Sequence, residues 1–436
     1  CKHCYNFWRE EGAKSLSMSK ETIDRLADMF VEAGVFHVIV SGGEPFSRFD
    51  VLEYSIIQMI RRGISVSCNS NLMLASEGQL KRLADAGLDH ILTSLNSCHA
   101  ETNDYLVSQP GAFEKIVRGI GIARRNNIRI SVNMIISQKN KDHVYDTGRF
   151  CHDLGCQKIF GTRTVPSVNI DNISDSEFKL LKEDAISALE QLIRVNKETG
   201  IMIGTLVSYP LCFLSDLEKY RDFVGRGCPA QAGHVIGINA NGEAHACVHE
   251  SQSYGNVFEI GIGKAYRNMI EWHDGSYRYE GCAGCDYIDI CQTGCRMSAK
   301  AYEGRLDGKD QLMETKDRFV KPYKLANDRS CYDKVSPEAK FIVPERIRFR
   351  KENGFYLLNI RWANTITVSD ETAEFLLKFR KSGREFSIND FGPDKREELI
   401  RLFFKDAVES RGMERIESGK MAGLSIDPSA LPKGAL

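Results

Sequence analysis

Seven cysteines in the second half of this 436-residue chain have spacings typical of metal ligands. Cys228 and Cys247 flank a short segment that contains Gly242, and Cys331 comes last. Between them lies a compact group with the spacing C-x2-C-x5-C-x3-C, made up of Cys282, Cys285, Cys291 and Cys295. Thiolates a few residues apart can reach one metal centre, because a short turn brings their sulfur atoms together. The pattern therefore predicts the ligands of zinc ions or of metal clusters.

Disulfide bonds explain these cysteines less well. The chain shows no secretory signal segment and no apolar run long enough to cross a bilayer, so we expect a cytoplasmic protein in a reducing compartment. Its 14 cysteines are also too few per residue for a disulfide scaffold. Ligand chemistry is the better interpretation, and zinc ribbons stay open at this point because C-x2-C pairs are common zinc ligands.

The balance of charges argues against nucleic acid as a partner. The chain has 58 Lys and Arg against 59 Asp and Glu, a formal net charge of -1. A nucleic-acid backbone is usually met by a basic stripe interleaved with aromatic side chains, and none stands out in this sequence. The length allows two or three domains, each with a core of its own.

A second set of residues that could do chemistry lies near the first residue. Cys1 and Cys4 form another C-x2-C pair, and about forty residues later an apolar run ends in Ser41-Gly42-Gly43-Glu44-Pro45. Glycines permit close approach of the backbone, and a neighbouring carboxylate can accept a hydrogen bond from an ammonium group. This turn is a candidate for binding a ligand with an amine; the alternative is a simple turn between a strand and a helix.

The elements that must position these residues alternate between strand and helix. Apolar runs predict strands at residues 35–40, 64–68, 90–95, 128–136 and 158–162. Amphipathic stretches predict helices at residues 19–33, 76–86, 112–125, 141–154 and 174–197. This alternation indicates an α/β fold with a parallel sheet, in which ligands gather at the carboxyl ends of the strands.

Polar residues stand where such strands should end. They are the run Asn69-Ser70-Asn71, then Ser94 and Asn96, then Asn133 on the next strand, and finally Arg163. Each alone is explained by an ordinary strand-end polar group whose hydrogen bonds are satisfied inside the protein. Their repetition from strand to strand favours a shared pocket.

The C-x2-C pair and the Gly-Gly-Glu-Pro turn resemble the motifs of the radical S-adenosylmethionine (SAM) family. The resemblance implies a partial (β/α)6 barrel over residues 1–205 and a 4Fe–4S cluster held by three thiolates, two of them from Cys1 and Cys4. The third would lie four residues before Cys1, and the first barrel strand would precede it. The residues expected to contact SAM are Gly42, Gly43, Glu44, Pro45, Ser94, Asn133, Arg163 and His3, the last by stacking beside the adenine. Asn96 stands where the family often has Asp, which puts a charged role there in doubt.

The seven-cysteine pattern, with its internal glycine, resembles the SPASM domain, here over residues 206–335. That resemblance favours two auxiliary 4Fe–4S clusters over zinc. It implies that the first cluster is held by Cys228, Cys247 and Cys295, and the second by Cys282, Cys285, Cys291 and Cys331. For the fourth ligand of the first cluster we expect Cys212, with His234 and a vacant iron as alternatives. A hairpin at residues 237–245 should turn Cys247 back toward Cys228.

The last hundred residues follow a different pattern. Residues 346–351 and 355–361 flank Asn353-Gly354, which predicts a hairpin, and residues 365–368 predict a third strand. Helices should run to about Arg380 and from 394 to 408. This small α+β, winged-helix-like domain at 341–436 resembles the RiPP recognition element, in which a leader peptide adds a strand to the sheet edge. An ordinary winged-helix or oligomerisation module is the alternative.

Taken together, the resemblances imply a radical SAM/SPASM peptide or protein maturase, an oxidoreductase-type enzyme. It would cleave SAM to a 5′-deoxyadenosyl radical and abstract hydrogen from a peptide, most naturally a ribosomal natural-product precursor with a leader peptide. A flavodoxin or ferredoxin would donate the electron, and neither nucleic acid nor membrane would be a partner. The alternatives are an anaerobic sulfatase-type maturase and a non-catalytic zinc or iron–sulfur scaffold. The modification formed and the catalytic side chain are left open.

Overall fold

The computed structural model describes residues 1–4, 17–165, 177–224, 227–314, 340–343, 347–352, 354–361, 364–390, 414–417 and 420–421. The chain divides into two compact units. The first comprises Cys1–Ala33, Ile39–Gln58 and Ser67–Lys324, and the second comprises Gly34–Val38, Met59–Val66 and Leu325–Leu436. The domain boundaries expected from the sequence stay predictions.

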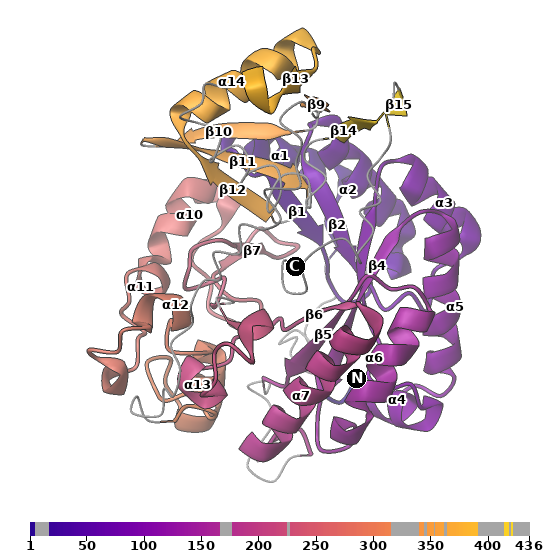
Figure 1. Ribbon diagram of the computed structural model, residues 1–436, viewed down its shortest axis with the longest axis vertical. Coiled ribbons are helices and arrows are strands. Elements are labelled where there is room, and N and C mark those ends of the chain that lie inside the picture. Colours follow the sequence, from indigo (N-terminus) through magenta and orange to yellow (C-terminus); the bar gives the residue numbers. More distant parts are fainter. Residues whose placement is uncertain are drawn as a thin grey trace. The chain divides into compact units, whose positions relative to one another are not determined.

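A six-stranded sheet in the order β1-β2-β3-β4-β5-β6 confirms the predicted α/β fold (Figure 1). Its strands are β1 (His37–Val40), β2 (Ser65–Asn69), β3 (His90–Ser94), β4 (Arg129–Ile136), β5 (Lys158–Arg163) and β6 (Met202–Gly204). Pairing from β2 to β6 is parallel. Because neighbours in the sheet are also neighbours in the sequence, all carboxyl ends lie on one edge. This is the sheet of a partial radical SAM barrel.

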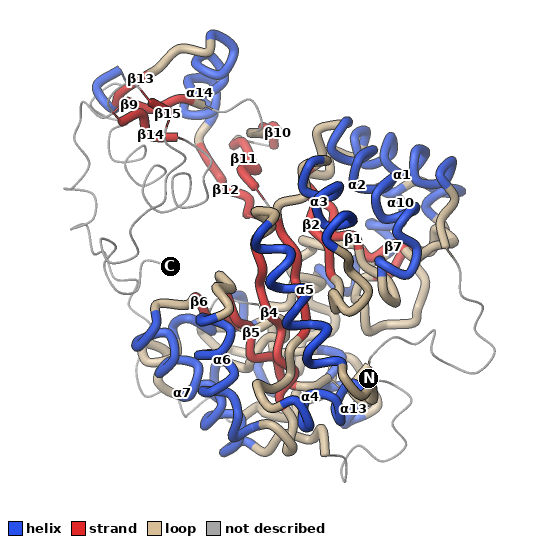
Figure 2. The backbone as a smooth tube through the Cα atoms, turned by 90° about the vertical axis from the view of Figure 1, so that its right-hand side faces the viewer, coloured by secondary structure: helices blue, strands red, loops and turns tan. Residues whose placement is uncertain are grey.

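Helices connect the strands. They are α1 (Lys20–Glu32), η2 (Pro45–Arg48), α2 (Phe49–Arg61), α3 (Glu77–Asp85), α4 (Ala100–Val107), α5 (Ala112–Arg125), η3 (Lys141–His143), α6 (Val144–Asp153) and α7 (Lys182–Thr199). Figures 1 and 2 show α4 to α7 on one side of the sheet. The strands bury Ile91, Val132 and Ile159 completely, so apolar burial between sheet and helices supplies the core of this half.

Two predicted boundaries differ from the structure. The helix expected from residue 174 begins at Lys182, because Gln138 ties down the segment before it. The Gln138 backbone N–H donates to Glu177 O at 2.8 Å, and its side-chain amide donates to Lys179 O at 3.0 Å. The short strand β6 was not predicted, since three residues show no periodicity. It supplies a sixth strand at the β5 edge.

Short elements make up the rest of the first unit. They are α8 (Leu211–Leu214), η5 (Arg221–Phe223), β7 (Gly237–Ile238), β8 (Ala244–His245), α9 (Val257–Ile260), α10 (Ile262–Asn268), α11 (Ile270–His273), η6 (Glu280–Cys282), α12 (Ile288–Cys291) and α13 (Arg296–Glu303). Strands β7 and β8 pair antiparallel, as the predicted hairpin requires. Arg296 is fully buried and donates to the carbonyl oxygens of Tyr277, Leu306 and Gly308. One guanidinium thus joins loops that no regular sheet connects.

The second unit contains two small antiparallel sheets. The hairpin of β10 (Arg348–Glu352) and β11 (Phe355–Arg361) is confirmed, and β12 (Asn364–Val368) pairs beside it. Helix α14 (Asp370–Ser382) begins at the predicted cap, where the Ser369 hydroxyl accepts from Thr372 N. A second sheet, which the sequence did not predict, has the order β13 (Phe386–Ser387), β9 (Lys340–Ile342), β14 (Glu414–Glu417) and β15 (Lys420–Met421). A 3₁₀ turn, η9 (Ile388–Asp390), follows β13, and the helix predicted at 394–408 lies outside the described residues.

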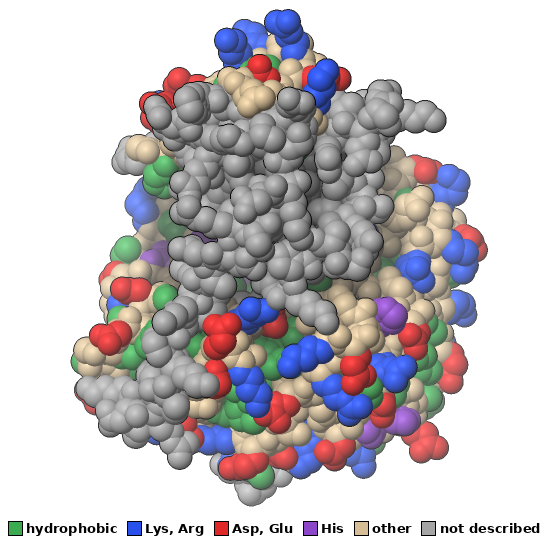
Figure 3. Space-filling model, viewed as in Figure 1, with side chains coloured by type: hydrophobic (Ala, Val, Ile, Leu, Met, Phe, Trp, Pro, Cys, Tyr) green, Lys and Arg blue, Asp and Glu red, His purple; other side chains and the backbone are tan. Residues whose placement is uncertain are grey.

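The described surface carries charges of both signs, interspersed over the face shown in Figure 3. This distribution agrees with the formal net charge of -1. In the described part of the chain, no helix combines the length and the apolar character needed to cross a membrane.

Candidate functional site

The Gly-Gly turn follows the carboxyl end of β1 and faces open space. Gly42 has a φ of +157°, which side-chain-bearing residues rarely adopt. A Cβ atom added to Gly42 or to Gly43 would meet no atom within 4 Å, and both residues are exposed. The backbone here can therefore be approached closely by a ligand.

The Glu44 carboxylate fastens this turn to the end of the neighbouring strand β2. Its Oε1 accepts from the Ser70 hydroxyl at 2.7 Å and from Phe46 N at 3.1 Å, and its Oε2 accepts from Asn71 N at 2.9 Å. Three of its roughly four acceptor positions are thus used inside the protein. We expected this side chain beside a ligand amine; the structure instead makes it the support of the turn.

Ser94 and Asn133 face each other across β3 and β4, as their register partners show. Asn133 Oδ1 accepts from the Thr162 hydroxyl at 2.6 Å, so a row of polar side chains crosses three adjacent strands. Asn96 is fully buried and its Oδ1 accepts from Ile135 N at 3.0 Å. That residue has a structural role, and the row formed by Ser94, Asn133 and Thr162 is the part that lines up with the Gly-Gly turn along the sheet edge.

Arg163, at the end of β5, turns its donors into the protein. It is 3% exposed, and its Nη1 and Nη2 lie 3.0 and 2.5 Å from the two oxygens of Asp310, which is fully buried. Its Nε and Nη2 also donate to Ser208 O. A contact with SAM stays a prediction for Arg163. Asp310 was missed in the sequence, where no motif marks it.

The turn containing Cys1 and Cys4 is anchored to α4. Lys2 N donates to Leu106 O at 2.9 Å, and the Lys2 ammonium lies 3.5 Å from the centroid of the Tyr105 ring. Cys1 is exposed and Cys4 is half-buried. The His3 ring meets Phe178 edge-on, with 6.1 Å between the ring centres. The two thiols therefore sit in a turn held from one side.

Cys228, Cys247 and Cys295 are brought together, as the SPASM pattern implied. Burial raises the pKa of Cys247, and the neighbouring thiols of Cys228 and Cys295 raise it further. Burial also raises the pKa of Cys295 to about 11, against the lowering effect of Arg163 and with a further rise from Cys228. Beside this group, His249 Nδ1 lies 3.7 Å from Cys247 Sγ.

The second group contains Cys282, Cys285 and Cys291. Burial raises the pKa of Cys282 to about 11, and Cys291 and Cys285 add to the rise. The predicted fourth member, Cys331, lies outside the described residues. Cys212 differs from our expectation, because its thiol neighbours this second group. Burial raises the pKa of Cys212 to about 11, the backbone of Glu314 opposes that, and Cys291 and Cys282 reinforce it.

The other candidate ligand of the first group, His234, is exposed. Among the described residues, no three His, Cys, Asp or Glu side chains converge on one point as the ligands of a single metal ion do. The two thiol groups are thus defined by their neighbours, and thirteen described cysteines are free thiols.

Gly242, the glycine of the cysteine pattern, has no room for a side chain. Its φ is +92°, and an added Cβ would lie 2.4 Å from Phe258 Cδ2 and 2.7 Å from Asn256 Oδ1. We expect Gly242→Ala to lower the free energy of unfolding by about 2–4 kcal/mol, through overpacking and left-handed strain together. Chemical denaturation measures this loss. Gly304→Ala is the control, since Gly304 has a φ of +78° but no atom within 4 Å of its Cβ position; equal losses would contradict the packing argument.

Comparison with known proteins places the chain in a family. The radical SAM superfamily model matches residues 1–151. GTP 3′,8-cyclase of Aquifex aeolicus is 30% identical over 297 residues, which cover 63% of this chain and 83% of that protein. The chain belongs to the radical SAM superfamily.

Further radical SAM relatives differ in the reactions for which they are named. AdoMet-dependent heme synthase of Nitratidesulfovibrio vulgaris is 24% identical, with 74% of this chain and 90% of that protein covered. PqqA peptide cyclase of Granulibacter bethesdensis is 23% identical, with 70% and 81% covered. The named relatives are enzymes, and so is this radical SAM protein.

Solved structures share the fold. Native anSMEcpe with bound AdoMet has a TM-score of 0.58 and 14% identity, covering 72% of this chain and 89% of that one. Streptococcus suis SuiB bound to precursor peptide SuiA has a TM-score of 0.56 and 15% identity, covering 72% of each chain. These similarities confirm the radical SAM fold.

The residues of this radical SAM protein fit the cofactors that the family implies, SAM and a 4Fe–4S cluster. The Gly42-Gly43 backbone lies open at the strand ends, where a close-fitting ligand needs space. Raised pKa values keep the thiols of Cys282 and Cys295 protonated at neutral pH. Iron binds thiolates, so loading these sites would release protons.

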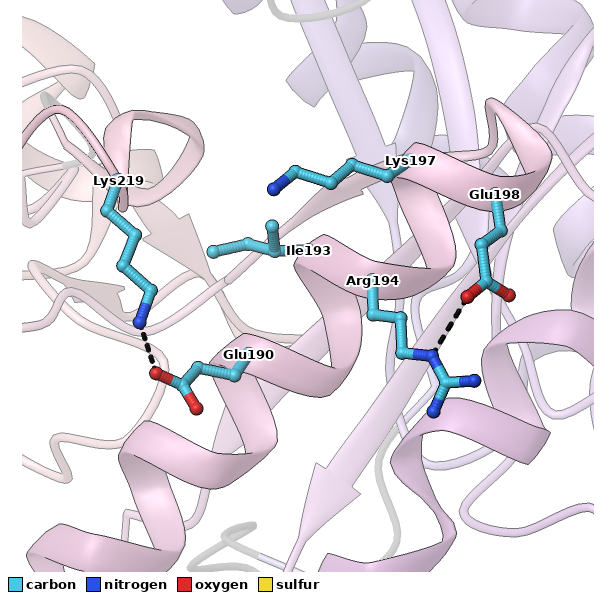
Figure 4. A pocket seen from close by; sticks show the side chains of 6 residues that line it. All are labelled: Glu190, Ile193, Arg194, Lys197, Glu198 and Lys219. Carbon is cyan, nitrogen blue, oxygen red and sulfur yellow. Dashed lines mark hydrogen bonds and ion pairs between the residues drawn. The ribbon is translucent and has the colours of Figure 1, made fainter.

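A surface hollow of about 330 Å³ is lined by Glu190, Ile193, Arg194, Lys197, Glu198 and Lys219 (Figure 4). Two ion pairs fill its wall. Glu190 pairs with Lys219, and Arg194 Nε lies 2.9 Å from a Glu198 oxygen. None of the predicted site residues lines it, so it is a charged surface feature of α7.

Proposed function

We propose that this radical SAM protein is a SPASM-type enzyme that abstracts hydrogen from a peptide substrate, most naturally a ribosomal natural-product precursor. The Gly42-Gly43-Glu44 turn carries the proposal, because Glu44 fixes it to the end of β2 while the two glycines leave its backbone open. The same compact unit contains both groups of thiols.

Each residue has a defined task in this proposal. SAM bound at a reduced 4Fe–4S cluster supplies a 5′-deoxyadenosyl radical. The open backbone of Gly42 and Gly43 binds the methionine end of SAM, and Cys1 and Cys4 bind iron. Ser94 and Asn133 present polar atoms from β3 and β4, in register with each other. Buried strands below them exclude water, which limits side reactions of a radical.

We propose further that the two groups of thiols hold auxiliary 4Fe–4S clusters. Cys228, Cys247 and Cys295 would hold one, and Cys282, Cys285 and Cys291 the other. Electrons would come from a flavodoxin or ferredoxin in the cytoplasm. The free state of the described cysteines suits such a reducing compartment.

A peptide substrate is supported by the relative named PqqA peptide cyclase and by SuiB, solved with a precursor peptide. Within the second unit, β10 and β12 form the two edges of the sheet β10-β11-β12. An edge strand presents unpaired backbone groups, so a leader peptide could pair with it as an added strand.

A small-molecule substrate is the second candidate. It is favoured by the names of two relatives, AdoMet-dependent heme synthase and GTP 3′,8-cyclase. The two candidates differ in what reads the substrate. Deleting residues after 340 should lower turnover of a peptide carrying a leader and leave turnover of a small molecule unchanged.

The proposal predicts iron, labile sulfide and SAM cleavage in the same sample. We expect the full-length protein, reconstituted anaerobically, to bind several iron and sulfide ions per chain and to absorb broadly near 400 nm. With dithionite and SAM it should form 5′-deoxyadenosine and methionine. Elemental analysis and chromatography measure these outcomes. A sample rich in zinc and lacking labile sulfide would support the scaffold alternative instead.

A further inference from the structure

Cys212 lies at the start of α8, outside the seven-cysteine pattern, and its surroundings are unusual for an isolated core thiol. The preceding backbone N–H, that of Leu211, is 3.5 Å from Cys291 Sγ. Cys212 is half-buried, as are Cys282, Cys285 and Cys291. The first turn of α8 is therefore in direct contact with the second group of thiols, although 80 residues separate the contacting pair.

A second segment joins the same thiols from another side. Glu314 N lies 3.3 Å from Cys212 Sγ, and the adjacent Met313 Sδ lies 3.7 Å from Cys282 Sγ. Two consecutive residues thus touch Cys212 and Cys282. Leu312 N donates to Asp310 Oδ1 at 2.9 Å, and Met313 N donates to Asp310 O at 2.9 Å, which fixes this segment.

These contacts enclose Cys212, Cys282 and Cys291 within one small region. The electrostatic neighbours agree, because the charges that raise the pKa of Cys212 are those of Cys291 and Cys282. For Cys247, the thiols with this effect are those of Cys228 and Cys295. Geometry and electrostatics therefore separate Cys212 from the first group.

We propose that Cys212 is the fourth thiolate of the second auxiliary cluster, completing a four-cysteine set with Cys282, Cys285 and Cys291. Four thiolates are the usual complement of a 4Fe–4S cluster. The first group then keeps the three cysteines Cys228, Cys247 and Cys295. This assignment rests on the proposed function, since it requires iron–sulfur clusters at both groups.

Iron and sulfide content of single variants tests the assignment. Cys212→Ala in the full-length, reconstituted protein should lose roughly a third of its iron and labile sulfide, because one of three clusters is lost. Cys331→Ala should lose none. Cys156→Ala is the matched control, a buried thiol in the barrel half. Unchanged iron in Cys212→Ala, with iron lost in Cys331→Ala, would overturn the proposal.

Double variants decide which cluster Cys212 belongs to. Cys212→Ala combined with Cys282→Ala should lose no more iron than Cys282→Ala alone, since both residues serve one cluster. Combined with Cys228→Ala, it should lose roughly two thirds of the iron, because two clusters are then removed. The reverse pattern would assign Cys212 to the first group and contradict us.

Two further measurements keep these outcomes readable. Far-UV circular dichroism and retention of the SAM cluster, seen by electron paramagnetic resonance with added SAM, show whether each variant is folded. Cys212→Ser should keep an altered cluster signal, since an alkoxide can replace a thiolate where a thiol of core packing would leave no spectral trace. If the unmodified protein takes up no labile sulfide, the proposed function itself fails, and that result differs from a failure of the Cys212 assignment.

Discussion

Asp310→Asn should lower the free energy of unfolding of the first unit by about 3–5 kcal/mol, the usual loss when one partner of a buried ion pair is removed. Arg163 and Asp310 are 3% and 0% exposed, and they are joined by two contacts. Asparagine keeps the shape of the side chain but leaves the guanidinium charge buried without its counter-charge. Denaturant unfolding, followed by tryptophan fluorescence, measures the loss.

A surface pair provides the control for this prediction. Asp307 lies 3.7 Å from Arg305, and both side chains are about half exposed. Asp307→Asn should therefore cost less than about 1 kcal/mol. The double variant Arg163→Met with Asp310→Leu should recover part of the stability, because it removes both buried charges. Equal losses in Asp307→Asn and Asp310→Asn would contradict the argument.

The same substitution should also disturb the first group of thiols. Asp310 Oδ2 accepts from Cys295 N at 2.8 Å, so the carboxylate that neutralises Arg163 also positions the backbone of a proposed ligand. Iron content below that of the unmodified protein, at denaturant concentrations where the fold persists, is the expected sign.

Glu44→Ala should weaken SAM binding by about 100-fold, which corresponds to about 3 kcal/mol. The substitution removes three hydrogen bonds to a carboxylate, and these join the Gly-Gly turn to the end of β2. Without them, the backbone that must meet SAM is no longer fixed, and the ordering has to occur on binding. Equilibrium dialysis with SAM and the yield of 5′-deoxyadenosine measure the effect.

A neighbouring glutamate controls for charge. Glu53, on α2, pairs with the exposed side chain of Arg82, and Glu53→Ala should leave SAM affinity within about twofold. Ser70→Ala should give an intermediate loss of about 10-fold, because one of the three hydrogen bonds disappears. Unchanged SAM affinity in Glu44→Ala would show that the turn keeps its shape by other means.

The sequence predicted the features that depend on neighbouring residues. Strands β3 and β4 were found because their apolar residues, such as Ile91 and Val132, are buried against helices. The hairpin of β10 and β11 follows from an Asn-Gly pair between two patterned runs. The spacing of Cys282, Cys285 and Cys291 fixes their proximity, because short turns leave the thiols few other positions.

The features that escaped prediction depend on contacts between distant residues. Nothing near Cys212 in the sequence indicates that residues 291 and 314 will meet it. Asp310 is ordinary until Arg163 packs against it, and Glu44 carries a ligand-binding motif while serving as a support. In each case the partner is chosen by tertiary packing, which local spacing does not encode.

The Arg163–Asp310 pair also sets a schedule for synthesis. The two residues are 147 positions apart, so at about 5–20 residues per second Arg163 emerges ~7–30 s before its partner. During that interval its charge has to remain in water, since burial without a counter-charge is too costly. The carboxyl end of β5 therefore cannot close on the ribosome until the thiol-bearing segment has been made. The barrel half should mature after the segment that follows it, and iron insertion should begin only when both are present.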